Sequence, residues 1–347
     1  MKIIRPISIT SANLTASNVP ETPPAAYAGG TTYALGDTVS VTTGTASVVY
    51  ESLQNANTGN TPASSPAWWQ EVATTYAVYS AGTSYALGDV VISTSTNHEY
   101  ESLANSNLGN ALTDATKWLD RGTDNRYRMF DQSNTSTTTR AELIDFTAQV
   151  TGRADSVALL NVTAASIQII ASTATDGEVY NETFDLVSTS GITDWYAWFF
   201  EPIVRQGDFV ATLPAYGDME VQVLINEPSG TAEIGTAVIG LSREIGGLVY
   251  GARIGIQDYS RKQADDFGNY TIIERAFSKR ASFKVVCDNS EIDAIAAILA
   301  QYRATPVVYI GADDYTSTYV YGFYRDWSSE IAFLTKSYFT FEIEGLT

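Results

Sequence analysis

Five aromatic side chains in the first third of the chain have the chemistry to bind a sugar. A flat, exposed aromatic ring offers a large apolar area, and such a ring can stack on the apolar face of a pyranose. The same rings could instead form the core of a small domain, where they would be closed to any ligand. The five candidates are Tyr50, Trp68, Trp69, Tyr100 and Trp118.

Trp68 differs from the other four candidates. Adjacent residues on a strand point to opposite faces, so Trp68 faces solvent if Trp69 faces the core. Trp118 has no aromatic neighbour of this kind. We therefore expect Trp68 to be a sugar platform, with a core position as the alternative. For the other four rings the core position is the expectation, and sugar contact is the alternative.

These rings belong to a segment of about fifty residues that occurs twice. Tyr-Ala-Leu-Gly-Asp stands at residues 33–37 and again at residues 85–89, an offset of 52. Tyr-Glu-Ser-Leu stands at residues 50–53 and 100–103, an offset of 50. Asparagines, a Gly-Asn pair and a tryptophan follow in both copies. A match of this length indicates an internal repeat.

Each copy predicts a mini-sheet of two or three strands. The Gly-Asp pair is a turn signal, a strand-like run follows it, and a second short strand ends at the tyrosine of Tyr-Glu-Ser-Leu. A unit this small buries little surface, so its aromatic side chains must supply the core. We expect two modules, at residues 26–72 and 76–122, that superpose on one another.

The repeated pattern resembles the small chitin-binding type of carbohydrate-binding module. In that family a Tyr-x-x-Gly-Asp-x-Val stretch, a tyrosine and a late tryptophan recur at this spacing. The resemblance covers roughly residues 26–122. It implies that the modules contact glycans.

The charge of the chain narrows its partners. The 39 acidic and 20 basic residues give a net charge of −19. Nucleic-acid binding needs a basic footprint, so we expect no nucleic-acid partner, and an anionic membrane is disfavoured for the same reason. Basic residues gather between Arg243 and Lys284. This stretch is expected to be a solvated strand edge, with a docking patch for another subunit as the alternative.

Few residues could perform catalysis. His98 is the only histidine and Cys287 the only cysteine, which excludes a histidine-rich zinc site and leaves little for triad catalysis. We place His98 at the surface and Cys287 in the core. The pairs Asp265-Asp266 and Asp313-Asp314 lie in turn-like runs, and adjacent carboxyls on an extended chain face opposite ways. We therefore expect no catalytic residues, no metal, no cofactor and no enzymatic activity.

The rest of the chain divides into an N-terminal arm and two larger domains. Residues 1–25 end in a proline-rich run and are expected to form an extended linker. Residues 125–246 contain short alternating runs, including residues 194–200, that predict a β-sandwich of jelly-roll type. Residues 247–347 predict an α+β domain. The expected fold class is mainly β and multi-domain: two small repeated β modules, a β-sandwich and a C-terminal α+β domain with one helix.

The one expected helix begins near residue 290. Ser290 is the predicted N-cap, with Asp293 three residues later. Apolar residues then recur at helical spacing and predict one buried face. These residues are Ile292, Ile295, Ile298, Leu299 and Tyr302.

The sequence contains no visible export or membrane signal. No stretch reaches the roughly 18 apolar residues of a transmembrane helix, and the first ten residues lack the apolar core of a signal peptide. We expect no membrane insertion and a protein made in the cytoplasm of its host cell. Sugar-binding modules without an export signal suit a protein that leaves the cell by lysis.

Short stretches spread over nearly the whole chain form a second pattern. They are Ile-Thr…Asn-Leu-Thr-Ala-Ser-Asn-Val-Pro-Glu at residues 9–21, Asn125-Arg126…Met129-Phe130-Asp131, Asp258-Tyr-Ser-Arg-Lys262…Asp266-Phe-Gly268 and Phe341-Glu-Ile-Glu-Gly-Leu346. This pattern resembles a family of structural proteins encoded by tailed bacteriophages and prophages. The usual form carries a single module, so two modules are a departure.

This second resemblance implies a component of a phage tail tip or baseplate. Such a protein would be located in the virion, would be oligomeric there, and would have other tail proteins and host surface glycans as partners. Tyr and Arg are common interface anchors, so we expect an assembly interface at Tyr259, Arg261, Lys262 and Arg275. The alternative is an extracellular polysaccharide-active enzyme or an accessory protein that binds chitin or another glycan.

Overall fold

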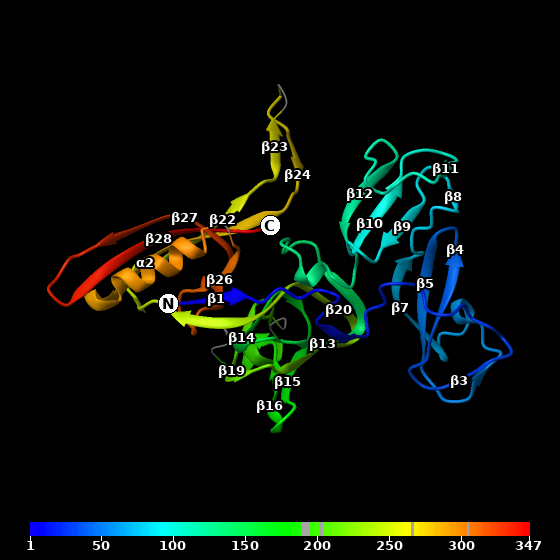
Figure 1. Cartoon of the computed structure of the whole chain (residues 1–347), viewed down its shortest axis with the longest axis horizontal. Helices are drawn as coiled ribbons and strands as arrows, with labels where there is room; N and C mark the ends of the chain where they lie inside the picture. The colour runs from blue at the N-terminus through cyan, green and yellow to red at the C-terminus, as the bar shows by residue number, and fades with distance from the viewer. Residues whose placement is uncertain (189–193, 201–203, 265–266, 304) are drawn as a thin grey trace.

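Strands dominate the structure. The computed structural model describes residues 1–188, 194–200, 204–264, 267–303 and 305–347. Within these residues the helices are few and short, which confirms the mainly β, multi-sheet fold class. Figure 1 shows the two repeated modules side by side at one end of the molecule and a larger body at the other.

A single sheet of 14 strands runs through the larger body. Its strands are β1 (Lys2–Pro6), β2 (Leu14–Ser17), β13 (Thr138–Gln149), β14 (Arg153–Thr163), β15 (Ser166–Thr173), β16 (Gly177–Asp185), β19 (Phe209–Gly217), β20 (Glu220–Glu244), β21 (Gly247–Leu248), β22 (Arg253–Asp258), β25 (Phe277–Asp288), β26 (Val307–Ile310), β27 (Tyr319–Glu330) and β28 (Lys336–Gly345). The long strand β20 pairs along its length with β13, β14, β15 and β1. It therefore connects one end of the sheet to its centre.

Alternating apolar residues build the core of residues 125–246, which were predicted to form a sandwich and are called the sandwich region below. On β15 and β20, Ile167 lies opposite Ile225 and Ile169 lies opposite Val223. All four side chains are buried. Because side chains alternate between the two faces of a strand, this register places one face of the pair in the core. The strands predicted within residues 156–225, apart from residues 194–200, are all present.

The prediction of a strand at residues 194–200 is wrong. These residues contain the short helix α1 (Trp195–Phe200), in which the backbone N–H of Trp198 donates to the carbonyl of Asp194 at 3.1 Å. The small strands β17 (Val187–Ser188) and β18 (Val204–Arg205), which precede and follow it in the sequence, pair with one another. Strand propensity reflects packing on a half-buried sheet, and the large aromatic rings of α1 are exposed instead.

The N-terminal segment is an integral strand of the sheet and not a free linker. β1 pairs with β20 on one side and with β26 on the other. The neighbouring side chains Ile3 and Ile4 are both fully buried, in two different core clusters. A strand that is covered on both faces loses its polar alternation, which is why the arm prediction failed.

The C-terminal region packs one helix against the sheet, as predicted. α2 (Ile292–Gln301) follows the turn η3 (Asn289–Glu291). Ile295, Leu299 and Tyr302 are buried, and Ile292 and Ile298 pack partly buried against the same cluster. The predicted N-cap Ser290 lies inside η3, whose own N-cap is Asp288, and the N-cap of α2 is Glu291. Asp288 forms a capping box with Glu291, in which each side chain binds the other residue's backbone N–H.

The predicted boundary at residues 246/247 does not separate two sheets. β1 lies between β20 of the sandwich region and β26 of the C-terminal region, so the hydrogen-bonded sheet continues across it. One further hairpin, β23 (Arg261–Ala264) with β24 (Tyr270–Ile273), extends from this region as a separate two-stranded sheet. Figure 1 shows it projecting from the body.

The two repeats fold with the same topology. Their strands are β3 (Thr32–Tyr33), β4 (Thr38–Thr43), β5 (Ala46–Ser52), β6 (Asn57–Thr58) and β7 (Trp69–Tyr76) in the first, and β8 (Ser84–Tyr85), β9 (Val90–Ser93), β10 (His98–Ser102), β11 (Asn107–Leu108) and β12 (Trp118–Thr123) in the second. β4-β5-β7 corresponds to β9-β10-β12, and the pair β3-β6 corresponds to β8-β11. Gly36 and Gly88 make the same turn, with φ of 86° and 89°, which explains the repeated Gly-Asp.

Candidate functional site

Each module is built around one tryptophan and two tyrosines. In the first, the ring centroids of Tyr27 and Tyr33 lie 5.9 Å apart in a stacked pair, and Trp69 meets Tyr33 edge-on at 5.1 Å. The second module repeats this trio. The corresponding rings are Tyr79, Tyr85 and Trp118, with Tyr79 and Tyr85 6.0 Å apart and Tyr85 and Trp118 5.3 Å apart. These rings provide the core that so small a sheet requires.

Trp69 and Trp118 are core residues, so the sugar-contact alternative does not hold for them. Each side chain is only 2% exposed. The indole Nε1 of Trp69 donates to the carbonyl of Asn60 at 2.8 Å, and that of Trp118 donates to the carbonyl of Asn110 at 3.1 Å. Both faces and the polar edge of each ring are therefore occupied by the module itself.

Trp68 is half-buried and not fully turned to solvent. It packs against the cluster of Tyr33, Val39 and Trp69 and keeps part of its surface open. The rule of opposite faces applies to strands, and Trp68 lies just before β7 begins. The backbone N–H groups of Trp68 and Trp69 both donate to the carbonyl of Ser65, at 2.9 and 3.0 Å, which is a turn. Trp68 remains a candidate platform through its open part.

The second module carries Lys117 at the position of Trp68. The backbone N–H of Leu53 donates to the carbonyl of Trp68 at 2.9 Å, and that of Leu103 donates to the carbonyl of Lys117 at 2.8 Å. The backbones thus coincide while the side chains differ. The two modules therefore present different chemistry at the one place where the first offers an accessible indole.

Tyr50 and Tyr100 lie half-buried at the edge of the two aromatic cores. Each has an acidic residue directly opposite on the neighbouring strand, Glu71 for Tyr50 and Asp120 for Tyr100. Burial, followed by the Glu71 carboxylate, raises the pKa of Tyr50. His98, predicted to lie at the surface, is half-buried, and its Nδ1 lies 2.9 Å from Oδ1 of Asp120. Each module thus pairs a partly open phenol ring with a carboxylate.

Exposed leucines follow the repeated tyrosine motifs in both copies. Leu35 and Leu87 follow the first tyrosine of each repeat, and Leu53 and Leu103 follow Tyr-Glu-Ser; all four are exposed. The backbone N–H of Leu35 donates to the side-chain oxygen of Asn55 at 3.0 Å, and the second repeat has the matching bond. The repeated asparagines therefore hold the loops in place, and each module has two exposed leucines.

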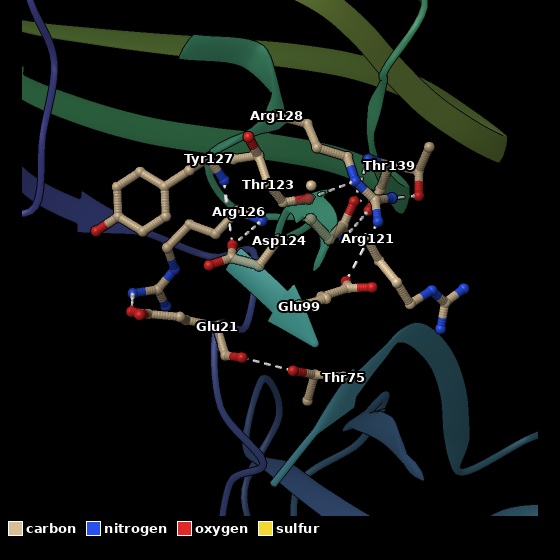
Figure 2. Close-up of polar contacts among 12 residues, drawn as sticks. Glu21, Thr75, Glu99, Arg121, Thr123, Asp124, Arg126, Tyr127, Arg128 and Thr139 are labelled. Atoms are coloured by element: carbon tan, nitrogen blue, oxygen red, sulfur yellow. Dashed lines mark hydrogen bonds and ion pairs between the residues drawn. The ribbon is translucent and has the colours of Figure 1, made fainter. Parts of the chain in front are cut away.

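A buried carboxylate lies where the second module joins the body. Figure 2 shows Asp124, which follows β12, among residues of the module, the N-terminal segment and the sandwich region. Its Oδ1 accepts hydrogen bonds from the backbone N–H groups of Arg126 at 2.9 Å and Tyr127 at 3.3 Å. Its Oδ2 is buried and has no hydrogen-bond partner among the described residues. Burial, followed by the nearby Glu21, raises the pKa of Asp124 to about 7.

Two arginines connect this junction to its surroundings, as Figure 2 shows. Arg126 donates from Nε to the carbonyl of Val19 at 2.7 Å, and its Nη1 lies 3.4 Å from Oε2 of Glu21. Arg128 donates from Nη2 to Oε1 of Glu99 at 3.2 Å. Glu99 is buried, and burial raises its pKa even though Arg128 acts in the opposite direction.

The first module is attached by a similar ion pair. The buried Arg140 of β13 pairs through Nη2 with Glu51 of β5, and its Nε donates to the carbonyl of Asn18 at 3.1 Å. The hydroxyl of Thr75 donates to the carbonyl of Glu21 at 2.5 Å. Both modules are therefore fixed to the body by partly buried polar contacts.

No sequence pattern predicts this junction. The stretch beginning Asn125-Arg126, one of the pieces of the phage-protein resemblance, is the part of the sequence that marks it. The side chain of Asn125 donates to the carbonyl of Thr139 at 2.9 Å and accepts from the backbone N–H of the same residue at 2.9 Å. This exchange fixes the chain at the exit of the second module, so the motif has a structural role.

The four predicted assembly residues lie together on one projecting element. Arg261 and Lys262 are on β23, Tyr259 precedes that strand, and Arg275 follows β24. Lys262 Nζ lies 2.8 Å from Oδ2 of Asp258. Arg261 and Arg275 form no ion pair with a carboxylate among the described residues. The structure therefore places these residues on a single exposed hairpin.

The residues with catalytic potential are dispersed. Asp313 pairs with Lys2 at 2.8 Å on the surface, Asp265-Asp266 lies outside the described residues, and Cys287 is buried as predicted. Burial raises the pKa of the Cys287 thiol. Among the described residues there is no cluster of three acidic, histidine or cysteine side chains that could hold a metal. None of their helices is long and apolar enough to span a membrane.

Comparisons with known proteins give little additional information. No protein-family model matches the chain, and neither does any curated protein. Two matching solved structures are crystal structures of chitosan-binding module 1 from a chitosanase/glucanase of Paenibacillus sp. IK-5, one of them a selenomethionine-labelled mutant. Both are 16% identical to this chain with a TM-score of 0.23. The mutant match covers 33% of this chain and 82% of the module, and the other covers 45% and 98%. A TM-score this low transfers neither fold nor ligand.

Proposed function

We propose that this chain is a non-catalytic structural protein of a bacteriophage tail that contacts host-surface glycans through its repeated modules. The observation that carries the glycan part is the partly open indole of Trp68 on the first module, whose backbone carbonyl accepts a hydrogen bond from the N–H of the exposed Leu53. An apolar platform of this kind suits the apolar face of a sugar ring. The core tryptophan Trp69 behind it keeps the platform rigid.

The charge of the modules favours neutral or cationic glycans. Residues 26–122 contain eight acidic and two basic residues, a net charge of −6. Carboxylates also lie opposite the two half-buried tyrosines, Tyr50 and Tyr100. These groups accept hydrogen bonds from sugar hydroxyls and attract ammonium groups, whereas they repel uronate or phosphate groups. We therefore infer that N-acetylated or amino sugars are bound in preference to acidic ones.

The tail assignment rests on the sequence resemblance and on the shape of the molecule. The modules are fixed at one end of the body through Glu51 and Glu99, and the exposed hairpin that bears Arg261 extends from another part (Figure 1). A structural protein that displays sugar-binding modules at one site and assembles at another is consistent with this separation.

A binding panel tests the glycan part of the proposal. The full chain is incubated with insoluble chitin, with chitosan and with a polyuronate, and the bound fraction is measured for the wild type, Trp68→Ala and Lys117→Ala. We expect chitin or chitosan to retain the wild type and Lys117→Ala but to release most of Trp68→Ala. Equal binding by all three proteins would remove Trp68 from the site, and release of shortened sugars would favour the enzyme alternative.

Mass spectrometry of purified virions tests the tail part separately. The coding gene is expected among tail genes, and the protein is expected in particles at a fixed ratio to other tail proteins. Its absence from washed particles would refute the tail assignment while leaving glycan binding intact.

A further inference from the structure

A two-stranded ribbon leaves the C-terminal region, and its outer pair of strands exposes both faces. The ribbon consists of β22, β23, β24 and the beginning of β25, up to residue 280. β22 pairs with β25, for example Ile256 opposite Lys279, and β23 pairs with β24, for example Lys262 opposite Ile272. All residues of β23 and β24 are exposed. In the described sheets β22 pairs only with β25, so its other edge is open.

The ribbon carries an unusual amount of exposed apolar surface. Ile256 is 64% exposed, Tyr270 is 70% exposed and Ile272 is 64% exposed. An isolated two-stranded hairpin is marginally stable in water, and a contiguous exposed apolar patch marks an interaction site. Ile273 and Phe277 are exposed along the same ribbon. The ribbon therefore has the properties of an element that is covered by another protein.

The ribbon carries a small positive charge in a strongly acidic chain. Residues 253–280 contain six basic and four acidic residues, a net charge of +2. Arg253, Arg261 and Arg275 have no ion pair with any described carboxylate. The chain as a whole has a net charge of −19. A basic, apolar ribbon on such a chain is complementary in charge to most of the surface of another copy.

The same chain provides an acceptor of matching character. An apolar cavity of about 390 Å³ lies at the base of the ribbon and is lined by Leu248, Tyr250, Ala252 and Tyr315, among others. Tyr250 and Tyr315 are exposed. Asp313 and Asp314 lie between Ala312 and Tyr315, which both line the cavity, and both aspartates are exposed; Asp313 is paired with Lys2 at 2.8 Å. The cavity thus combines apolar walls with an acidic edge, whereas the ribbon combines apolar side chains with arginines.

We propose that the ribbon of one copy docks onto this cavity of a second copy of the chain. Ile272 and Tyr270 would lie against the apolar walls, and Arg261 and Arg275 would lie near the acidic rim. The donor and the acceptor are different surfaces, so the contact is head-to-tail and repeats from copy to copy, closing a ring where the rotation allows. The proposal is independent of glycan binding and concerns the self-assembly of the protein.

Cysteine cross-linking of the full chain tests this contact. The single variants Ile272→Cys and Tyr315→Cys are mixed under mild oxidation; both sites are exposed, and the native Cys287 is buried. We expect a disulfide-linked dimer from the mixture and little from either variant alone. If Ile272→Cys alone gives as much disulfide-linked dimer as the mixture, two ribbons contact one another and the proposed acceptor is wrong.

Charge reversal tests the same contact in solution. Sedimentation velocity compares the wild type with Arg261→Glu/Arg275→Glu, with Asp314→Lys and with the chain that carries all three changes; Asp313 is kept because it pairs with Lys2 of the same chain. We expect oligomers in the wild type, dissociation in the double and in the single variant and recovery in the threefold variant, with unchanged circular dichroism throughout. Trp68→Ala should assemble like the wild type. If the wild type stays monomeric at its highest soluble concentration, the proposal that a second copy occupies the cavity is wrong. The same conclusion holds if a monomeric wild type cross-links to a different protein in virions.

Discussion

Trp68 and Lys117 occupy equivalent backbone positions in the two modules, and the carbonyl of each accepts a hydrogen bond from the corresponding leucine, Leu53 or Leu103, at 2.9 and 2.8 Å. The cores behind them have the same trio of rings. The chain therefore contains a natural comparison: one scaffold with an indole at this position and one with an ammonium group. If the two modules differ in sugar binding, the side chain at this position explains the difference, because the fold is the same in both.

A reciprocal exchange at this position should move the binding site. Trp68→Lys should abolish most glycan binding, and adding Lys117→Trp to the same chain should restore part of it on the second module. Binding to chitin fragments, followed by calorimetry, measures both effects. If the double variant recovers glycan binding, the indole alone determines binding on either module. If the double variant does not bind glycan, other residues of the first module are required.

The core tryptophans should control stability and not binding. Trp69→Ala and Trp118→Ala each remove a buried ring and its hydrogen bond, so we expect a loss on the order of 3–5 kcal/mol from the affected module. Trp68→Ala should cost clearly less, because its ring is partly exposed. Thermal unfolding by calorimetry checks the order, and a loss for Trp68→Ala as large as that for Trp69→Ala would make Trp68 another core residue.

Asp124 should make the junction more stable at mildly acidic pH. Its pKa is about 7 in the folded protein, against an ordinary value of 3.8, so the folded state binds the proton more tightly. Stability should therefore increase as the pH falls from about 7 towards 4, and the cost of the buried charge should be fully present above pH 7. Asp124→Asn keeps an acceptor for the N–H groups of Arg126 and Tyr127.

The melting temperature of the wild type should therefore be higher at pH 5 than at pH 8, and Asp124→Asn should flatten this difference. Glu99 also has a raised pKa and contributes in the same direction, so the slope need not vanish. An unchanged pH dependence in Asp124→Asn would show that the carboxylate is solvated and not buried.

The two members of the Glu51–Arg140 pair should not be equivalent. Arg140 is buried and also donates to the backbone carbonyls of Asn18 and Leu143, the latter at 2.9 Å, whereas Glu51 is more exposed. Removing the arginine leaves Asn18 and Leu143 without these donors, which is costly in a buried setting. Arg140→Met should therefore destabilise the protein more than Glu51→Gln, as measured by chemical denaturation. The reverse order would mean that the carboxylate carries the contact.

The modules could be predicted from the sequence because their determinants are local. The Gly36 and Gly88 turns require a positive φ, and the tyrosines and tryptophans of each repeat contact one another within fifty residues. The buried face of α2 was predictable for the same reason, since Ile295 and Leu299 lie at helical spacing. Short-range patterns were sufficient for these elements.

Contacts between distant segments could not be predicted. β1 looked like part of a linker because its partners, β20 and β26, lie hundreds of residues away. The aromatic run at residues 195–200 has strand-like composition, but its rings are exposed and it forms a helix. Asp124 and its neighbours come from three segments, so no spacing in the sequence brings them together. Within the candidate site, the burial of Trp69 followed from the repeat, but the turn that leaves Trp68 half-buried did not.

The most direct test of glycan contact is a titration of the full chain with a soluble chitin oligosaccharide, measured by calorimetry for the wild type and for Trp68→Ala. A ring that stacks on a flat ligand contributes about 1–3 kcal/mol, by analogy with rings that stack on nucleic-acid bases. We predict saturable binding by the wild type and a loss of roughly tenfold or more in affinity for Trp68→Ala, since 1.4 kcal/mol corresponds to a factor of ten. Equal affinity of the two proteins, or no binding by either to neutral and amino-sugar oligomers, would contradict the proposal.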